Sequence, residues 1–95
     1  MPAYVISDLE VRDPVLIDEY RKLAAASIAQ YGGRYLARGG TIHPIAGGWT
    51  PESIVIVEFP SIERAHEWFD SPEYAPARAI AVRALSRRLI FVEGV

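Results

Sequence analysis

The stretch Ile54-Val55-Ile56-Val57-Glu58-Phe59 is the most strand-like part of this chain, and the predicted fold is built around it. Ile and Val branch at Cβ, which restricts them in a helix and lets them pack well on a pleated sheet. Pro60-Ser61 follows directly, and a serine there can accept a hydrogen bond from the first turn of a helix. The stretch therefore predicts a strand that leads at once into a helix. The side chains of that helix expected to face inward are Ile62, Ala65, Trp68 and Phe69.

The chain upstream of this strand predicts a strand, a helix and another strand. Residues 3–11 are rich in β-forming side chains and end at Asp13-Pro14, where Asp can cap a helix and Pro suits its first position. Gly32-Gly33 ends that helix, because glycine reaches the left-handed conformation without strain. A strand over residues 34–38 follows. One apolar stripe on the helix consists of Ile17, Tyr20, Ala24, Ile28 and Tyr31.

Glycine and proline divide the remaining segments. We interpret Gly39-Gly40 as a bulge or bend, after which a strand continues over residues 41–46. Helical structure restarts near Ser71-Pro72 and, after an interruption at Pro76, continues to Leu85. The last strand is predicted over residues 89–92.

The predicted order is therefore strand, helix, strand, strand, helix and strand. This is the order of the ferredoxin-like α+β fold. Both helical regions then cover one face of a four-stranded antiparallel sheet, and the other face is left open.

Length and composition fit one small globular domain over residues 1–95. The 10 basic and 12 acidic side chains give a net charge of −2, and no basic stripe marks a nucleic-acid binder. The chain has no Cys, which excludes disulfides, thiolate nucleophiles and zinc–thiolate sites. The first residues contain neither a basic leader nor a long apolar stretch, so we expect no signal peptide, no membrane span and a cytoplasmic location.

Side chains alternate across a strand, so each predicted strand divides into two sets. The set that we place under the helices consists of Val5, Ser7, Leu9, Val11, Tyr35, Ala37, Val55, Val57, Phe59, Ile90 and Val92. The open set consists of Tyr4, Ile6, Asp8, Glu10, Arg34, Leu36, Arg38, Ile54, Ile56, Glu58, Leu89, Phe91 and Glu93.

The open set is apolar at one end and charged at the other. Exposing so many apolar side chains would lose about 1.5–3 kcal/mol for each one left unburied. We therefore predict that a second copy of the chain covers this face in a twofold homodimer, and that the charged ends line a cleft beneath the cover. The alternative is that the apolar content of the strands reflects β-propensity alone.

Five segments resemble one family along the whole chain. They are Met-Pro-Ala-Tyr-Val-Ile at the start, residues 32–40, Glu58-Phe59-Pro60-Ser61, residues 68–74, and the closing Val-Glu-Gly-Val. Together they are similar to the family called domain of unknown function 1330. The resemblance implies a dimeric α+β barrel, a superfamily that also holds cofactor-free oxygenases, lactone isomerases and haem-handling proteins. It implies no particular reaction and no catalytic residues.

Glu58 and Arg38 are the candidate catalytic pair. A carboxylate in an apolar strand is desolvated, which raises its pKa and suits it to proton transfer. Arg38 could orient an anionic or carbonyl substrate through its planar set of donors. The alternative is a structural ion pair between the two, because a buried charge needs a partner.

Six other side chains are candidates for ligand binding: Tyr4, Ile6, Ile56, Trp68, Tyr74 and Arg78. The alternative for Trp68 and Tyr74 is that they belong to the core, which is more common for aromatic residues at this spacing. The alternative for Arg78 is that it is exposed to solvent. His43 and His66 have neither a helical partner nor a neighbouring Cys, so we expect no metal site, and we expect no cofactor.

Two functions remain open at this point. The first is a cofactor-free enzyme, an oxygenase or isomerase, that acts on a small and largely apolar molecule. The second is a non-catalytic homodimer that binds such a molecule, or in which Glu58 and Arg38 merely hold the interface.

Overall fold

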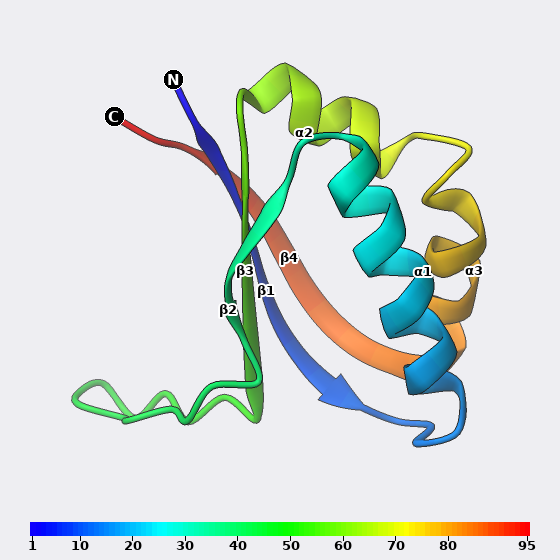
Figure 1. Ribbon diagram of the computed structural model, residues 1–95. Helices are drawn as coiled ribbons and strands as arrows, with labels where there is room; N and C mark the ends of the chain where they lie inside the picture. Colours follow the sequence, from blue (N-terminus) through cyan, green and yellow to red (C-terminus); the bar gives the residue numbers. More distant parts are fainter.

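The computed structural model describes residues 1–95 and shows three helices on one face of a four-stranded antiparallel sheet (Figure 1). The strand order is β2-β3-β1-β4, so the ferredoxin-like prediction is confirmed. None of the helices is long and apolar enough to cross a membrane. The elements are β1 (Ala3–Val11), α1 (Leu16–Gln30), β2 (Arg34–Arg38), β3 (Ser53–Phe59), α2 (Ile62–Phe69), α3 (Ala75–Ala84) and β4 (Leu85–Glu93).

The predicted caps position the first two helices. Asp13 Oδ1 accepts hydrogen bonds from the backbone N–H groups of Val15 at 2.9 Å and Leu16 at 3.1 Å, and α1 begins there. Ser61 Oγ accepts from the N–H of Arg64 at 3.1 Å and caps α2. At the end of α1 a Cβ on Gly33 would lie 2.7 Å from both Ile28 and Phe59, so only glycine lets the chain pass this close to β3.

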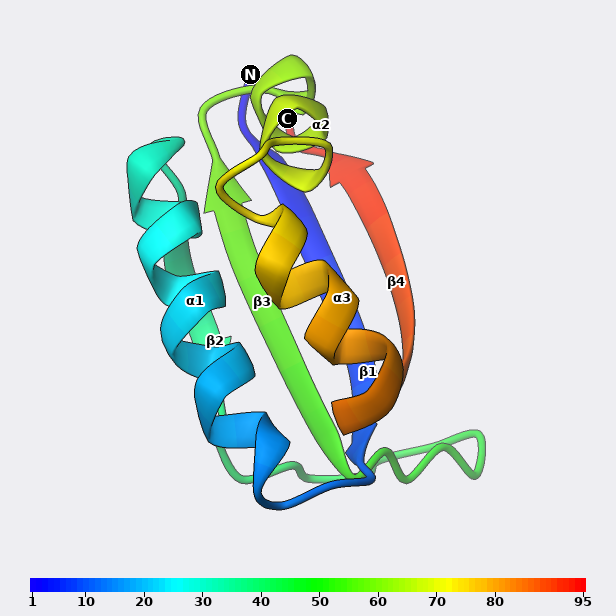
Figure 2. The same ribbon diagram turned by 90° about the vertical axis from the view of Figure 1, so that its right-hand side faces the viewer.

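The predicted second helical region is two helices joined at Ser71. Its Oγ donates to the carbonyl of Trp68 at 2.7 Å and accepts from the N–H of Tyr74 at 3.0 Å. This buried hydroxyl therefore connects the end of α2 with the residue before α3. The corner allows α3 to lie beside α1 over the same face of the sheet (Figure 2).

An aromatic cluster forms the centre of the core. The ring of Trp68 lies 5.3 Å from that of Phe59 and 4.3 Å from that of Tyr74, measured between centroids. The indole N–H of Trp68 donates to Ser27 Oγ on α1 at 3.0 Å, so its polar atom is satisfied inside the core. Around the rings lie Val5, Ala24, Ile28, Val57, Ala65 and Ala77.

A bulge in β2 corrects the predicted register. Arg34 opposes Glu58 and Tyr35 opposes Val57, but Ala37 then opposes Ile56 and Arg38 opposes Val55. The extra residue is Leu36, not the glycine pair that we expected. Because one extra residue reverses the alternation, Arg38 lies on the helix side of the sheet and Ala37 on the open side.

The predicted strand over residues 41–46 is wrong. Residues 39–52 contain no strand and leave the sheet as an arm between β2 and β3 (Figure 1). Gly39, at its base, has a φ of 71°, a left-handed conformation that turns the chain out of the ladder. The arm projects on the side of the sheet opposite the helices (Figure 1).

The faces predicted for β4 are also reversed. Val5 opposes Phe91 and Ser7 opposes Leu89, so Leu89 and Phe91 lie on the helix side, with Glu93 opposite Ala3. Ile90 and Val92 therefore lie on the open side. Four consecutive apolar residues, Leu89 to Val92, show no alternation, so the sequence did not distinguish the two registers. The strand also begins at Leu85, four residues before the predicted start.

The open face is nevertheless apolar at its centre, as predicted for the other strands. Its central side chains are Tyr4, Ile6, Ile54, Ile56, Ile90 and Val92. Ile90 is 56% exposed and Val92 is 41% exposed. Ion pairs flank the apolar centre: Arg34 with Glu58 at 2.8 Å and Arg88 with Asp8 at 2.7 Å. An apolar centre with a charged rim is the composition of a contact surface.

Candidate functional site

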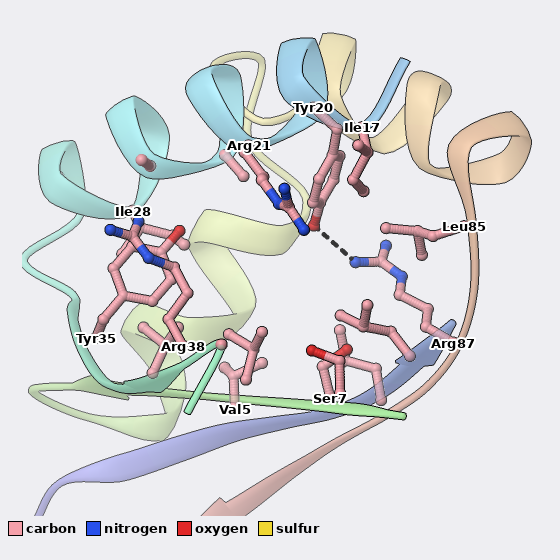
Figure 3. A pocket seen from close by; sticks show the side chains of 18 of the residues that line it. Val5, Ser7, Ile17, Tyr20, Arg21, Ile28, Tyr35, Arg38, Leu85 and Arg87 are labelled. Carbon is pink, nitrogen blue, oxygen red and sulfur yellow. Dashed lines mark hydrogen bonds between the residues drawn. The ribbon is translucent and has the colours of Figure 1, made fainter. Parts of the chain in front are cut away.

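A cavity lies between α1 and the sheet, on the face opposite the cleft that we predicted (Figure 3). Its volume is about 580 Å³, within the usual range for small-molecule sites. Val5, Leu9, Val55, Val57 and Leu89 form an apolar floor. The residues of α1 that form the roof include Ile17, Ala24, Ala25 and Ile28, so the predicted apolar stripe does face the sheet.

Three polar side chains meet at one end of the cavity. Arg87 Nη1 on β4 donates to the hydroxyl of Tyr20 on α1 at 3.1 Å and to that of Tyr74 at 2.8 Å. The two hydroxyl oxygens are 2.9 Å apart. Figure 3 shows Tyr20 and Arg87 approaching one another across the cavity. We call Tyr20 and Arg87, which both line the cavity, the Tyr20–Arg87 site.

The two tyrosine hydroxyls share one hydrogen bond, in which either oxygen can be the donor. Tyr74 is fully buried, whereas Tyr20 lines the cavity. The Tyr20 hydroxyl is therefore the one of the two that a bound molecule can reach. Burial and the neighbouring Tyr74 raise the pKa of Tyr20 well above its usual range, so this hydroxyl stays protonated and acts as a donor.

Arg87 stays charged at any physiological pH. Burial acts to lower its pKa, but the oxygens of Tyr74 and Tyr20 outweigh this effect and raise the pKa. No carboxylate lies within ion-pair distance of Arg87, so its hydrogen bonds to protein groups are made to neutral oxygens. The Tyr20–Arg87 site therefore offers a positive charge and a neutral O–H to whatever enters.

The charge of the whole lining is positive, although the chain is acidic overall. Four basic side chains and no Asp or Glu line the cavity. Arg21 makes a 3.7 Å ion pair with Asp18 on the outer surface. The four basic residues are Arg21, Lys22, Arg38 and Arg87.

Arg38 lies at the other end of the cavity. Its guanidinium lies over the ring of Tyr35, 4.2 Å from the centroid, and both residues line the cavity (Figure 3). Burial raises the pKa of Tyr35, although Arg38 opposes the shift. We call this pair the Arg38–Tyr35 site. It lies on β2, whereas Arg87 lies on β4 at the far edge of the sheet.

Ser7 places an unsatisfied hydroxyl on the floor between these two ends. The residue is 6% exposed, lines the cavity, and its Oγ has no hydrogen-bond partner in the protein (Figure 3). Leaving a buried polar atom without a partner costs about 1–3 kcal/mol. Such an atom in a cavity wall is a hydrogen-bonding point for a bound molecule.

The structure separates the two predicted catalytic residues. Glu58 lies on the open face, where its Oε1 accepts from Nε of Arg34 at 2.8 Å. Arg38 lies on the opposite face, so the predicted pairing of Arg38 with Glu58 is wrong. The cause is the bulge at Leu36, which changes the face on which Arg38 lies. The proposed role of Glu58 as proton acceptor stays a prediction.

The candidate ligand-binding residues divide in the same way. Tyr4, Ile6 and Ile56 lie on the open face and do not line the cavity. Trp68 lines the cavity, and Tyr74 lies behind its wall and supports Tyr20. Arg78 does not reach it, because its guanidinium lies over the ring of Phe69 and pairs with Asp70 at 3.3 Å on the outside.

Sequence reasoning missed Arg87, Tyr35 and Ser7 as site residues. Arg87 fell outside the predicted last strand, although it continues the inward set of Leu85 and Leu89 at the two-residue spacing of a strand. If the strand is started at Leu85, Arg87 stands out as a charged residue among apolar residues that face the helices, and this pattern indicates a site residue. Tyr20 lies on the predicted apolar stripe of α1, and that pattern alone gives no sign of its place in the site.

Comparisons with known proteins agree with this fold. A family model described as domain of unknown function (DUF1330) matches residues 2–95. A comparison with curated proteins found no match. Among solved structures, a protein of unknown function from Rhodopseudomonas palustris is 18% identical with a TM-score of 0.76, and the alignment covers 99% of this chain and 82% of that one.

Two further structures show the same architecture. A dimeric ferredoxin-like protein of unknown function from Bacteroides fragilis is 20% identical, with a TM-score of 0.68 and coverage of 98% of this chain and 96% of that one. SnoaB, a cofactor-independent oxygenase from Streptomyces nogalater, is 10% identical, with a TM-score of 0.68 and coverage of 99% and 93%. At these identities the likeness concerns the fold.

Proposed function

This chain belongs to the family of domain of unknown function 1330, and on that premise we propose that it binds a small, largely apolar molecule with an anionic or carbonyl end in the cavity under α1. The observation that carries the proposal is the Tyr20–Arg87 site. A half-buried guanidinium without a carboxylate partner and a protonated tyrosine hydroxyl lie together in a largely apolar cavity. A hydrogen bond to a charged group is worth about 1.5–3 kcal/mol, so an oxyanion there is favoured over a neutral or cationic group.

Three probes of equal chain length test this proposal: octanoate, octan-1-ol and octylammonium. We expect octanoate to bind most tightly in titration calorimetry at neutral pH, because only its head group complements Arg87. Arg87→Met keeps the apolar stem and removes the charge, so this variant should lose the preference by about tenfold or more. Arg83→Met is the matched control, because Arg83 is exposed on α3 and does not line the cavity. Equal binding of octanoate and octan-1-ol by the unaltered protein would refute the proposal.

Cofactor-free catalysis in the same cavity is the second candidate. The Arg87 guanidinium and the Tyr20 hydroxyl lie close together in the cavity wall. Two neighbouring donors can stabilise the oxyanion of an enolate, an intermediate that a cofactor-free oxygenase or isomerase could use. The architecture is shared with a cofactor-independent oxygenase, which supports the candidate at the level of the fold alone. Against it, no Asp, Glu or His lines the cavity to take a proton.

Glu58→Gln and Arg87→Met together show on which face any catalysis occurs, because Glu58 lies on the open face and Arg87 lines the cavity. If Glu58 is a proton acceptor for a molecule bound on the open face, Glu58→Gln loses exchange of the acidic hydrogen of a β-diketone in deuterated buffer, followed by NMR, and Arg87→Met keeps it. If Glu58 only pairs with Arg34, Glu58→Gln keeps any exchange activity and shows a lower melting temperature. Exchange that survives in the Glu58→Gln variant would therefore remove Glu58 from the reaction.

We further propose that the chain forms a homodimer through the open face. Solved structures with this fold from Bacteroides fragilis and Thermobifida fusca are described as dimeric. The apolar centre of the open face and its two flanking ion pairs support the proposal. The arm of residues 39–52 projects on this side with Ile45 90% exposed and Trp49 57% exposed, so it would lie against the second copy (Figure 1).

A cytoplasmic location stays a prediction that cell fractionation tests.

A further inference from the structure

We propose that the molecule held in this cavity has an acidic group at each end, with the second group bound at the Arg38–Tyr35 site. The inference rests on the proposed function and names the ligand class of the same site. It follows from the position, charge and surroundings of Arg38.

The sheet register places the two arginines at opposite ends of the cavity floor. Arg38 opposes Val55, and Val55 opposes Ser7, so Arg38 and Ser7 share one cross-strand row. Arg87 opposes Leu9, which lies two residues further along β1. Three strand intervals separate β2 from β4, so the two Cα atoms lie roughly 16 Å apart in a flat sheet of about 4.8 Å spacing.

The bulge at Leu36 directs Arg38 into the cavity. In regular pairing this side chain would point to the open face, toward the ion pairs there. Instead it lies over Tyr35 at the mouth of the cavity and forms no ion pair with any carboxylate (Figure 3). The face of an aromatic ring fixes the plane of a guanidinium while its N–H groups remain free for an oxyanion.

The space between the two sites suits an apolar body. The floor and roof are made of aliphatic side chains, and the only unsatisfied buried polar side-chain atom is Ser7 Oγ. A molecule with one acidic end would leave Arg38 without an anionic partner. A molecule with two acidic ends pairs both arginines, and its second carboxylate gains a charge-assisted hydrogen bond at the exposed Arg38.

Suberate and octanoate, which have equal length and differ only in the second carboxylate, decide between these cases. We expect the unaltered protein to bind suberate about fivefold more tightly than octanoate at neutral pH and low ionic strength. A series from glutarate through adipate and suberate to sebacate should show an optimum length, because both ends must be reached at once. Titration calorimetry gives each dissociation constant.

Two variants of Arg38 and one control locate the second contact. Arg38→Met should reverse the preference, because the second carboxylate then enters an apolar region without a partner. Arg38→Lys should keep much of the preference, and Arg83→Met should change nothing. These residues are exposed, so the variants are expected to fold.

The outcomes separate the two proposals. If octanoate binds as tightly as suberate or more tightly, and Arg87→Met still weakens octanoate, the ligand has one acidic end and only this inference is overturned. The same holds if Arg38→Met leaves a preference for suberate unchanged. If Arg87→Met affects neither acid, the proposed function itself is wrong.

Discussion

Ser7 carries a buried hydroxyl without a protein partner in the floor of the cavity. A side chain that costs stability in the empty protein is expected where it serves a bound molecule. We therefore expect Ser7→Ala to raise the free energy of unfolding by about 1 kcal/mol, because the variant removes an unsatisfied buried atom. Thermal unfolding without ligand measures this change. A lower melting temperature would show that the hydroxyl already has a partner in the empty protein.

The same variant should weaken binding of a ligand with a polar atom at its centre. Pimelate and its central-ketone analogue form a matched pair, since only the ketone can accept a hydrogen bond from Ser7 Oγ. We expect the unaltered protein to prefer the ketone and Ser7→Ala to show no preference, with both constants measured by calorimetry. Tighter binding of pimelate to both proteins would contradict this role.

At the scale of elements, the corner between α2 and α3 depends on Ser71. Its hydroxyl makes two buried hydrogen bonds, to the carbonyl of Trp68 and from the N–H of Tyr74. Ser71→Ala leaves both backbone groups without this partner, so we expect a loss of about 1–3 kcal/mol in the free energy of unfolding. Because Tyr74 supports Tyr20 through its hydroxyl, octanoate binding should weaken as well. Denaturant titration measures the first effect, and Ser86→Ala is the control, because Ser86 makes no side-chain hydrogen bond and does not line the cavity.

At the scale of the whole molecule, the two faces of the sheet differ in what covers them. The helix side encloses the cavity, and the open side is proposed to bind a second copy. Ile56→Asp places a charge in the apolar centre of the open face, so we expect sedimentation to change from twice the chain mass to a species of 10.5 kDa. Val82→Asp is the matched control, because Val82 is 80% exposed on α3. An unaltered protein that sediments at 10.5 kDa at micromolar concentration would disprove the dimer.

The element order and the general character of the two faces could be predicted because their causes are local. Asp13 and Ser61 cap helices through backbone groups a few residues away, and the β-branched residues of β3 specify a strand by themselves. The faces of β1 and β3 followed from regular alternation. Where alternation was absent, in Leu89 to Val92, the prediction for β4 was reversed.

The site could not be predicted because its causes are not local. One extra residue at Leu36 changes the face on which Arg38 lies, and a bulge is decided by the pairing of two strands. Tyr20, Tyr74 and Arg87 come from three elements and meet only when α1 and α3 pack together over β4. The sequence by itself therefore determined the strand-rich segment 54–59, the caps and the layered fold. Only the tertiary structure decided which face holds the cavity and which charges line it, because these depend on contacts between segments far apart in the sequence, which no local pattern specifies.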